Sequence, residues 1–214
     1  MVYTVLDKHN ISILVADIKE NSIITIGTPH HTPGGVLDMR SCISRVGDEN
    51  VGYLGFHVAD MLKCSFICAC NYFIDPNKSM QTDYSKAIIK SKPKYLIEIH
   101  GHGKRNSQND VEISCGSRQK EDHAIRLQMK LTELIGQFVL TNSNWEDLRK
   151  IKIEAEFDKI FYRATKTATI TEQKWEAYHI ELSPMLRKDN NSKVPEIGLK
   201  FSELLARAIK EICI

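Results

Sequence analysis

Two apolar, strand-like runs in this sequence stop at histidine and pass into loops that contain glycine. The first ends in Thr28-Pro29-His30-His31, and the second ends in His100-Gly101-His102-Gly103. The carboxyl ends of neighbouring parallel strands meet at one edge of an α/β sheet, which is where such sheets bind ligands. We therefore expect a fold in which the two histidine-bearing strand ends share one crevice.

Strand-like and helix-like segments alternate through the first half of the chain. By their hydrophobic period, strands are expected at 11–16, 23–28, 65–73 and 94–100, and helices at 48–62 and 80–91. Such alternation is typical of a mainly parallel sheet that is covered on both faces. We predict an α/β fold over residues 1–214: a single-domain, three-layer sandwich with a mostly parallel mixed sheet, phosphorylase/hydrolase-like.

The second half is less regular. The pattern predicts a helix over 121–135 that Gly136 ends, strands at 137–141 and 177–182, and an edge hairpin within 158–174. Residues 196–212 carry the apolar stripe of a closing helix, and 189–193 are expected to form an exposed loop.

Composition excludes several classes of partner. The 214 residues are 42% apolar and 26% charged, with a net charge of +2, which favours neither nucleic acid nor an anionic membrane. No apolar run approaches the roughly 18 residues of a membrane-spanning helix, and the first residues lack a signal-peptide pattern. A cytoplasmic location is expected, and the oligomeric state is left open.

The six cysteines do not form a metal motif. Cys64, Cys68 and Cys70 lie in one apolar run with no paired CxxC elsewhere. Buried free thiols, which behave as small apolar side chains, are the better interpretation.

Histidines and carboxylates supply the candidate metal ligands. Adjacent residues seldom face one ion, so either His30 or His31 is expected to bind, together with His100. Asp48 suits the N-cap of the following helix, which leaves Glu49 free to reach the metal. Two histidines and one carboxylate with an open position are the ligands of a catalytic zinc ion.

Other polar residues could act beside that ion. Glu181 lies in an alternating strand, where a glutamate is costly unless it is paired or functional, and it is our candidate general base. Asn77 and Lys78 could hold a carboxylate of a small-molecule or short-peptide substrate. Arg45 and His102 are candidate helpers that stabilise an oxyanion.

Taken together, these segments resemble the N-formylglutamate amidohydrolase family, a branch of the zinc-carboxypeptidase and aspartoacylase-like hydrolases, over roughly residues 23–187. Pro29-His30-His31 is similar to the family's Pro-His-Ser-Gly, which implies His30 as the first ligand. Its neighbour His31 is then expected to contact the substrate. Asp48-Glu49 is similar to the acidic helix start that supplies the carboxylate ligand. Glu98-Ile99-His100-Gly101 stands where the family has Asp-x-His-Ser, which implies His100 as the third ligand.

Two later segments extend the resemblance. Asp75-Pro76-Asn77-Lys78 resembles the family's Asp-x-Asn-Arg, and residues 180–187 look like its late Ile-Glu-x-Asn-Arg-x-Leu segment. In the wider group the glutamate of such a strand is the general base. Lys78 departs from the family's arginine and lacks its planar fork, and Gly101-His102 replaces the serine.

The resemblance implies a zinc-dependent hydrolase that cleaves an amide or peptide bond of a small acidic N-acyl amino acid or peptide. One alternative is a catalytically degenerate member that binds metal as a binding module. Another is a phosphate- or nucleotide-handling α/β enzyme that uses residues 32–35 as an anion loop, although neither GxxxxGK[ST] nor GxGxxG occurs in the chain.

Overall fold

The alternating segments of the first half form the parallel centre of one sheet. The computed structural model describes residues 2–6, 11–34, 47–72 and 74–214. The strands in these ranges are β1 (Val2–Leu6), β2 (Ile11–Asp17), β3 (Ile24–Thr32), β4 (Asp48–Glu49), β5 (Ser65–Cys70), β6 (Tyr95–Gly101), β7 (Val111–Ser114), β8 (Ile153–Glu154) and β9 (Glu176–Leu182).

The helices in the same ranges are α1 (Val51–Leu62), α2 (Asp83–Ser91), α3 (Glu121–Thr141), α4 (Ala168–Thr171), α5 (Pro184–Arg187) and α6 (Glu196–Cys213), with 3-10 segments η1 (Arg118–Lys120) and η2 (Ser143–Lys150). No helix in the described part of the chain combines the length and the apolar character that crossing a bilayer requires.

The sheet is mixed, as predicted. Its strand order is β1-β2-β5-β3-β6-β9-β7-β8, and β4 pairs with β3 beside this path. Strands β5, β3, β6 and β9 run parallel, whereas β2 and β7 flank them in the antiparallel direction. The parallel centre therefore places the carboxyl ends of β3, β6 and β9 at the same edge.

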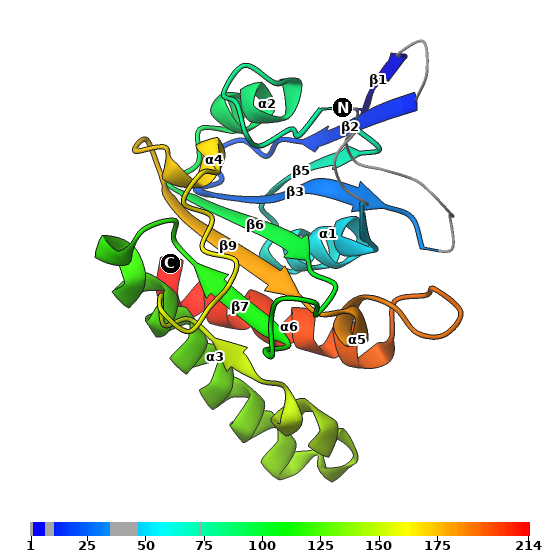
Figure 1. Ribbon diagram of the computed structural model, residues 1–214, viewed down its shortest axis with the longest axis vertical. Coiled ribbons are helices and arrows are strands. Elements are labelled where there is room, and N and C mark those ends of the chain that lie inside the picture. The colour runs from blue at the N-terminus through cyan, green and yellow to red at the C-terminus, as the bar shows by residue number, and fades with distance from the viewer. Residues whose placement is uncertain (1, 7–10, 35–46, 73) are drawn as a thin grey trace.

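Helices cover both faces of the sheet, which confirms the three-layer α/β architecture (Figure 1). On one face α1, α3 and α6 pack over a large apolar core that includes Ile97 and Ile180. On the other face α2 and α4 pack over a smaller core around Tyr84 and Leu96.

Strand alternation explains why this second face becomes polar toward the carboxyl ends. Residues two apart on a strand share a face, so Glu98 and His100 follow Leu96 on β6. His179 and Glu181 lie on the same face of β9, because Glu98 pairs with His179 and His100 with Glu181 in register. All four of these polar side chains are buried.

The expected start of the first helix was wrong. Helix α1 begins at Val51, because Asp48 and Glu49 pair as β4 with the end of β3. Asn50 occupies the N-cap position in the left-handed conformation, with φ 63°. Asp48 is therefore a strand residue and not the helix cap.

The second half differs more from its prediction. Helix α3 continues through Gly136 to Thr141, so the expected strand at 137–141 is helical. Burial of Ile135 and Val139 in the core outweighs the cost of roughly 1 kcal/mol for glycine within a helix. The described segment 158–174 forms turns and α4, not a hairpin, whereas the strand at 177–182 and the closing helix are confirmed.

The cysteine prediction is confirmed for the described residues. Cys64, Cys68, Cys70, Cys115 and Cys213 are free thiols. Burial raises the pKa of Cys68 to about 12, so this thiol stays protonated and unreactive near neutral pH. Cys42 lies outside the described residues.

Helix α3 offers a matched test of the core. Leu131 is fully buried, whereas Leu140 on the same helix is 76% exposed. We expect Leu131→Ala to lower the free energy of unfolding by about 2–5 kcal/mol through lost packing, and Leu140→Ala to change it by less than about 0.5 kcal/mol. Urea denaturation measures both, and equal losses would contradict the assignment of the core.

Candidate active site

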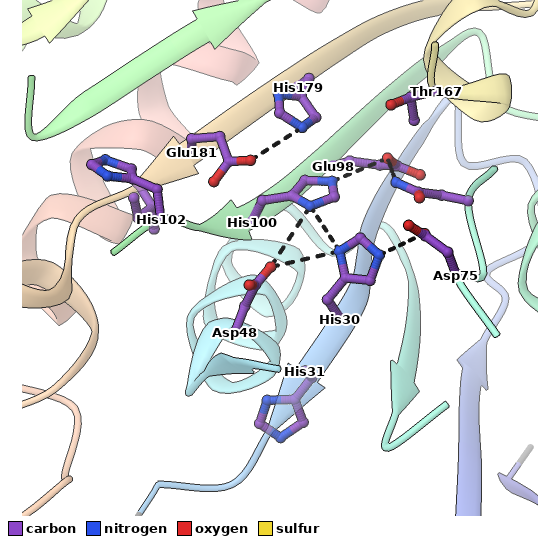
Figure 2. A network of polar contacts seen from close by, with 12 residues as sticks. His30, His31, Asp48, Asp75, Glu98, His100, His102, Thr167, His179 and Glu181 are labelled. Atoms are coloured by element: carbon purple, nitrogen blue, oxygen red, sulfur yellow. Dashed lines mark hydrogen bonds and ion pairs between the residues drawn. The ribbon is translucent and has the colours of Figure 1, made fainter. Parts of the chain in front are cut away.

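Three side chains from three strands converge at the carboxyl edge of the sheet (Figure 2). The Nδ1 atoms of His30 on β3 and His100 on β6 are 3.2 Å apart. Asp48 Oδ2 on β4 lies 3.6 Å from the Nδ1 of His30 and 3.8 Å from that of His100. The exposed fraction of each residue is 4% or less, so the cluster is shielded from solvent.

An irregularity in β3 decides which of the two adjacent histidines joins the cluster. The register between β3 and β5 shifts between Thr28 and His31. His30 then faces His100, whereas His31 packs against α1, where its Nδ1 accepts a hydrogen bond of 3.1 Å from Gly52 N–H. Burial lowers the pKa of His31 to about 4, which keeps the ring neutral and able to accept that bond.

Of the two adjacent histidines, His30 is the one that lies in the cluster. His31 is not among the residues that line the adjacent cavity, so its position does not agree with the expected contact to substrate. Successive strand residues face opposite sides of a sheet, and the irregularity in β3 sets which of the two faces His100.

The carboxylate beside the histidines belongs to Asp48, and this corrects the expected placement of Glu49. The Glu49 carboxylate forms an ion pair with Lys188 Nζ, and its backbone oxygen accepts a hydrogen bond from Arg187. Successive residues of β4 face opposite sides, so Asp48 faces the imidazoles while Glu49 faces the segment that follows β9.

Two further carboxylates hold the outer nitrogens of the imidazoles. His30 Nε2 lies 2.8 Å from Asp75 Oδ1, and His100 Nε2 lies 3.2 Å from Glu98 Oε2. An Nε2–H that is donated to a carboxylate leaves the lone pair on Nδ1. Metal-binding histidines are commonly oriented by such carboxylates. With both rings in this tautomer, the two Nδ1 atoms, 3.2 Å apart, present lone pairs that suit a shared cation.

The geometry fits a zinc ion. Tetrahedral zinc with bonds of about 2.1 Å places its ligand atoms about 3.4 Å apart. The three separations in the cluster are 3.2, 3.6 and 3.8 Å. Two imidazole nitrogens and one carboxylate oxygen are also the donor set of a catalytic zinc site with an open position.

A cavity of ≈ 440 Å³ opens beside the cluster. Its wall includes both histidines of the cluster and four of the residues expected to act on substrate, which are Asn77, Lys78, His102 and Glu181. Arg45, the remaining candidate, lies outside the described residues. The roles of all these side chains stay predictions, but four of them share one cavity.

Glu181 lies directly beside the cluster. It is the in-register partner of His100 on β9 and is only 4% exposed. Its Oε1 atom is 3.5 Å from His179 Nε2. The His179 ring in turn packs 4.3 Å from the His100 ring, and burial holds the pKa of His179 well below its usual value, so the ring is neutral.

Sequence reasoning assigned no role to His179. The spacing of His179 could have indicated one. It lies two residues before Glu181 on the same strand, so both side chains lie on one face. The polar ligand atoms of His100, His179 and Glu181 all lie within 4.8 Å of one another.

The far wall of the cavity carries a cation. Lys78 Nζ donates a hydrogen bond of 2.9 Å to Thr167 Oγ1. Asn77 Nδ2 donates to Glu98 Oε2 at 2.9 Å, and Asn77 Oδ1 has no hydrogen-bond partner among the described residues. His102 packs 5.4 Å from Tyr162 between ring centroids, and burial lowers the pKa of His102.

Comparison with known proteins identifies similar structures but no similar sequence. No protein-family model matches the chain, and no curated protein matches its sequence. Among solved structures, N-formylglutamate amidohydrolase from Ralstonia eutropha JMP134 is similar with a TM-score of 0.60 at 10% identity, over 93% of this chain and 96% of that one. A bacteriophage poly-gamma-glutamate hydrolase is similar with a TM-score of 0.54 at 14% identity, over 94% and 88%.

A metallo-carboxypeptidase from Burkholderia cenocepacia is similar with a TM-score of 0.50 at 10% identity, over 94% of this chain and 60% of that one. The chain thus has an α/β sandwich fold similar to those of the amidohydrolase and the carboxypeptidase, and the resemblance found in the sequence is confirmed at the level of the fold. At 10–14% identity, these similarities show the fold alone.

The neighbouring acids on β4 give a direct test of the cluster. We expect Asp48→Asn to weaken zinc binding by at least about 10-fold, because it removes an anionic ligand, and Glu49→Gln to leave it unchanged. Competition of the purified proteins with a zinc-binding dye measures both. A larger loss for Glu49→Gln than for Asp48→Asn would reverse the placement.

Proposed function

We propose that this chain is a zinc-dependent hydrolase that cleaves an amide bond. The observation that carries the proposal is the buried His30–Asp48–His100 cluster, with ligand atoms 3.2–3.8 Å apart, beside a cavity that also contains Glu181. The similar structures are an amidohydrolase, a poly-gamma-glutamate hydrolase and a metallo-carboxypeptidase, which supports the same class of reaction.

Zinc, when bound, supplies the Lewis acidity that makes water nucleophilic near neutral pH. Asp75 and Glu98 hold His30 and His100 so that both present Nδ1. Glu181 accepts the proton of the attacking water and passes it to the leaving amine. Its position on β9 suits this role, because it is the in-register partner of His100 and lines the same cavity as the cluster.

The substrate in this proposal is a small molecule or short peptide that carries a carboxylate. Lys78 and Thr167 present a charged donor and a hydroxyl to the cavity, and Asn77, which donates to Glu98, lines the same cavity. A lysine offers one point charge where an arginine would offer a planar fork. The cavity of ≈ 440 Å³ has the size of small-ligand sites, about 300–1,000 Å³. An N-acyl amino acid with an acidic side chain fits this description.

The phosphate-loop alternative gains no support from the described part of that loop. The backbone N–H of Gly34 donates a hydrogen bond of 2.9 Å to Asn50 Oδ1, so it is already used within the protein. A catalytically degenerate member that acts as a binding module would have the same cluster. It would bind stoichiometric zinc but hydrolyse no substrate.

Elemental analysis followed by an activity screen tests the proposal. The purified protein should contain one zinc ion and hydrolyse an N-acyl amino acid or acidic dipeptide. A chelator should abolish this activity and zinc should restore it. Absence of zinc binding, or hydrolysis that resists chelation, would refute the proposed function.

The role of Glu181 has its own signature. Glu181→Gln should retain zinc but lower kcat by about 10²–10⁴-fold, the usual contribution of a general base. Glu176→Gln is the matched control, because Glu176 lies at the opposite end of the same strand and pairs with His123 on the surface. Unchanged kcat in Glu181→Gln with full zinc content would eliminate the base assignment.

Substrate recognition by Lys78 can be separated from catalysis. Lys78→Met should raise KM for a carboxylate-bearing substrate by about 10–100-fold, since a hydrogen bond to a charged group contributes about 1.5–3 kcal/mol. Zinc content should stay the same. Lys78→Arg keeps the charge and is expected to keep most of the affinity. A KM that is insensitive to both changes would exclude Lys78 from the binding site.

A further inference from the structure

Arg187 is a buried cation whose hydrogen bonds join three separate segments of the chain. It ends α5 and is 5% exposed. Its Nε donates to Leu182 O at 3.0 Å, Nη1 to Glu49 O at 2.9 Å and Nη2 to His102 O at 3.1 Å. One guanidinium therefore ties the end of β9, the end of β4 and the loop after β6.

Each of the three acceptors lies within two residues of a residue of the candidate active site. Glu49 follows Asp48, and Leu182 follows Glu181, whereas His102 is two residues beyond His100. Strand β4 contains two residues and, among the described strands, pairs only with β3. The position of Asp48 therefore depends strongly on contacts beyond its own short strand, and Arg187 supplies one of them.

The close packing of Gly101 against the guanidinium shows how tightly this contact is built. A Cβ atom at Gly101 would lie 2.4 Å from Arg187 Cζ and 2.5 Å from its Nε, whereas one at Gly103 would meet nothing within 4 Å. Only glycine at 101 lets the end of β6 lie against the guanidinium. The backbone oxygen of Arg187 is fixed as well, by a hydrogen bond of 2.9 Å from Asn50 Nδ2.

A buried charge is costly unless it is fully hydrogen-bonded. The rigid fork of arginine can serve several acceptors at fixed angles, which the single ammonium of lysine cannot reproduce. The three carbonyls therefore hold Arg187 in place, and Arg187 in return fixes their separations.

We propose that Arg187 is a positioning residue of the metal centre, which holds the ends of β4, β6 and β9 at the spacing that zinc requires. This inference rests on the proposed function. Arg187 acts on the candidate ligands through the backbone that carries them, because it donates to the backbone oxygens of Leu182, Glu49 and His102.

Zinc affinity of the folded protein is the decisive measurement, made by chelator competition after circular dichroism confirms the fold. Arg187→Met and Arg187→Lys should each bind zinc about 10–100-fold more weakly, the loss typical of residues that orient metal ligands. Gly101→Ala should weaken zinc binding to a similar degree, because its methyl group displaces the Arg187 guanidinium. Added guanidinium ion at non-denaturing concentration should restore affinity in Arg187→Gly.

Three controls separate positioning from general stability. Gly103→Ala should keep wild-type zinc affinity, because it has room for the methyl group. Lys188→Ala should keep it too, because its ion pair with Glu49 is partly exposed and such pairs contribute little. Leu131→Ala should lose stability while the folded protein retains its zinc affinity.

The outcomes are distinct. The positioning role would be overturned if folded Arg187→Lys and Gly101→Ala bind zinc as tightly as the wild-type protein does. The proposed function would then still stand. An equal loss of affinity in Leu131→Ala would also overturn it. If Arg187→Met fails to fold, Arg187→Lys and Gly101→Ala decide the question. Wild-type protein that binds no zinc would overturn both proposals.

Discussion

The in-register pairing of β6 with β9 is the constraint on which the candidate site depends. It sets His100 beside Glu181 and Glu98 beside His179 on one face, while Ile97, Ile99 and Ile180 enter the large core. Strand side chains alternate with a period of two, so a slip of β9 by one residue would turn His179 and Glu181 into that core. The apolar face therefore fixes the geometry of the polar one.

Much of the fold followed from local pattern. Alternating strands and helices predicted the parallel centre of the sheet, and the strand ends predicted that His30 and His100 would lie together. The choice of Asp48 over Glu49 could not be predicted in this way, because it depends on the pairing of β4 with β3 and on Lys188, far along the chain. Short-range helix-capping rules favoured the other acid.

Other departures share that origin in long-range packing. Helix α3 passes through Gly136 because its apolar face is buried against the core, and sequence alone does not show that face to be covered. His179 carried no motif of its own, and Arg187 was noted only as the last residue of the segment 180–187, with no role assigned to it. Their neighbours are supplied by other strands, so their importance is visible only when β4, β6 and β9 are seen together.

The contact between Gly101 and Arg187 has a consequence for the evolutionary record of this fold. A side chain at 101 and a guanidinium at 187 compete for one volume, so neither position can drift alone without cost. Among homologous sequences, a residue larger than glycine at the first site should occur together with a smaller residue at the second. Such paired substitution would trace the history of this interaction across lineages.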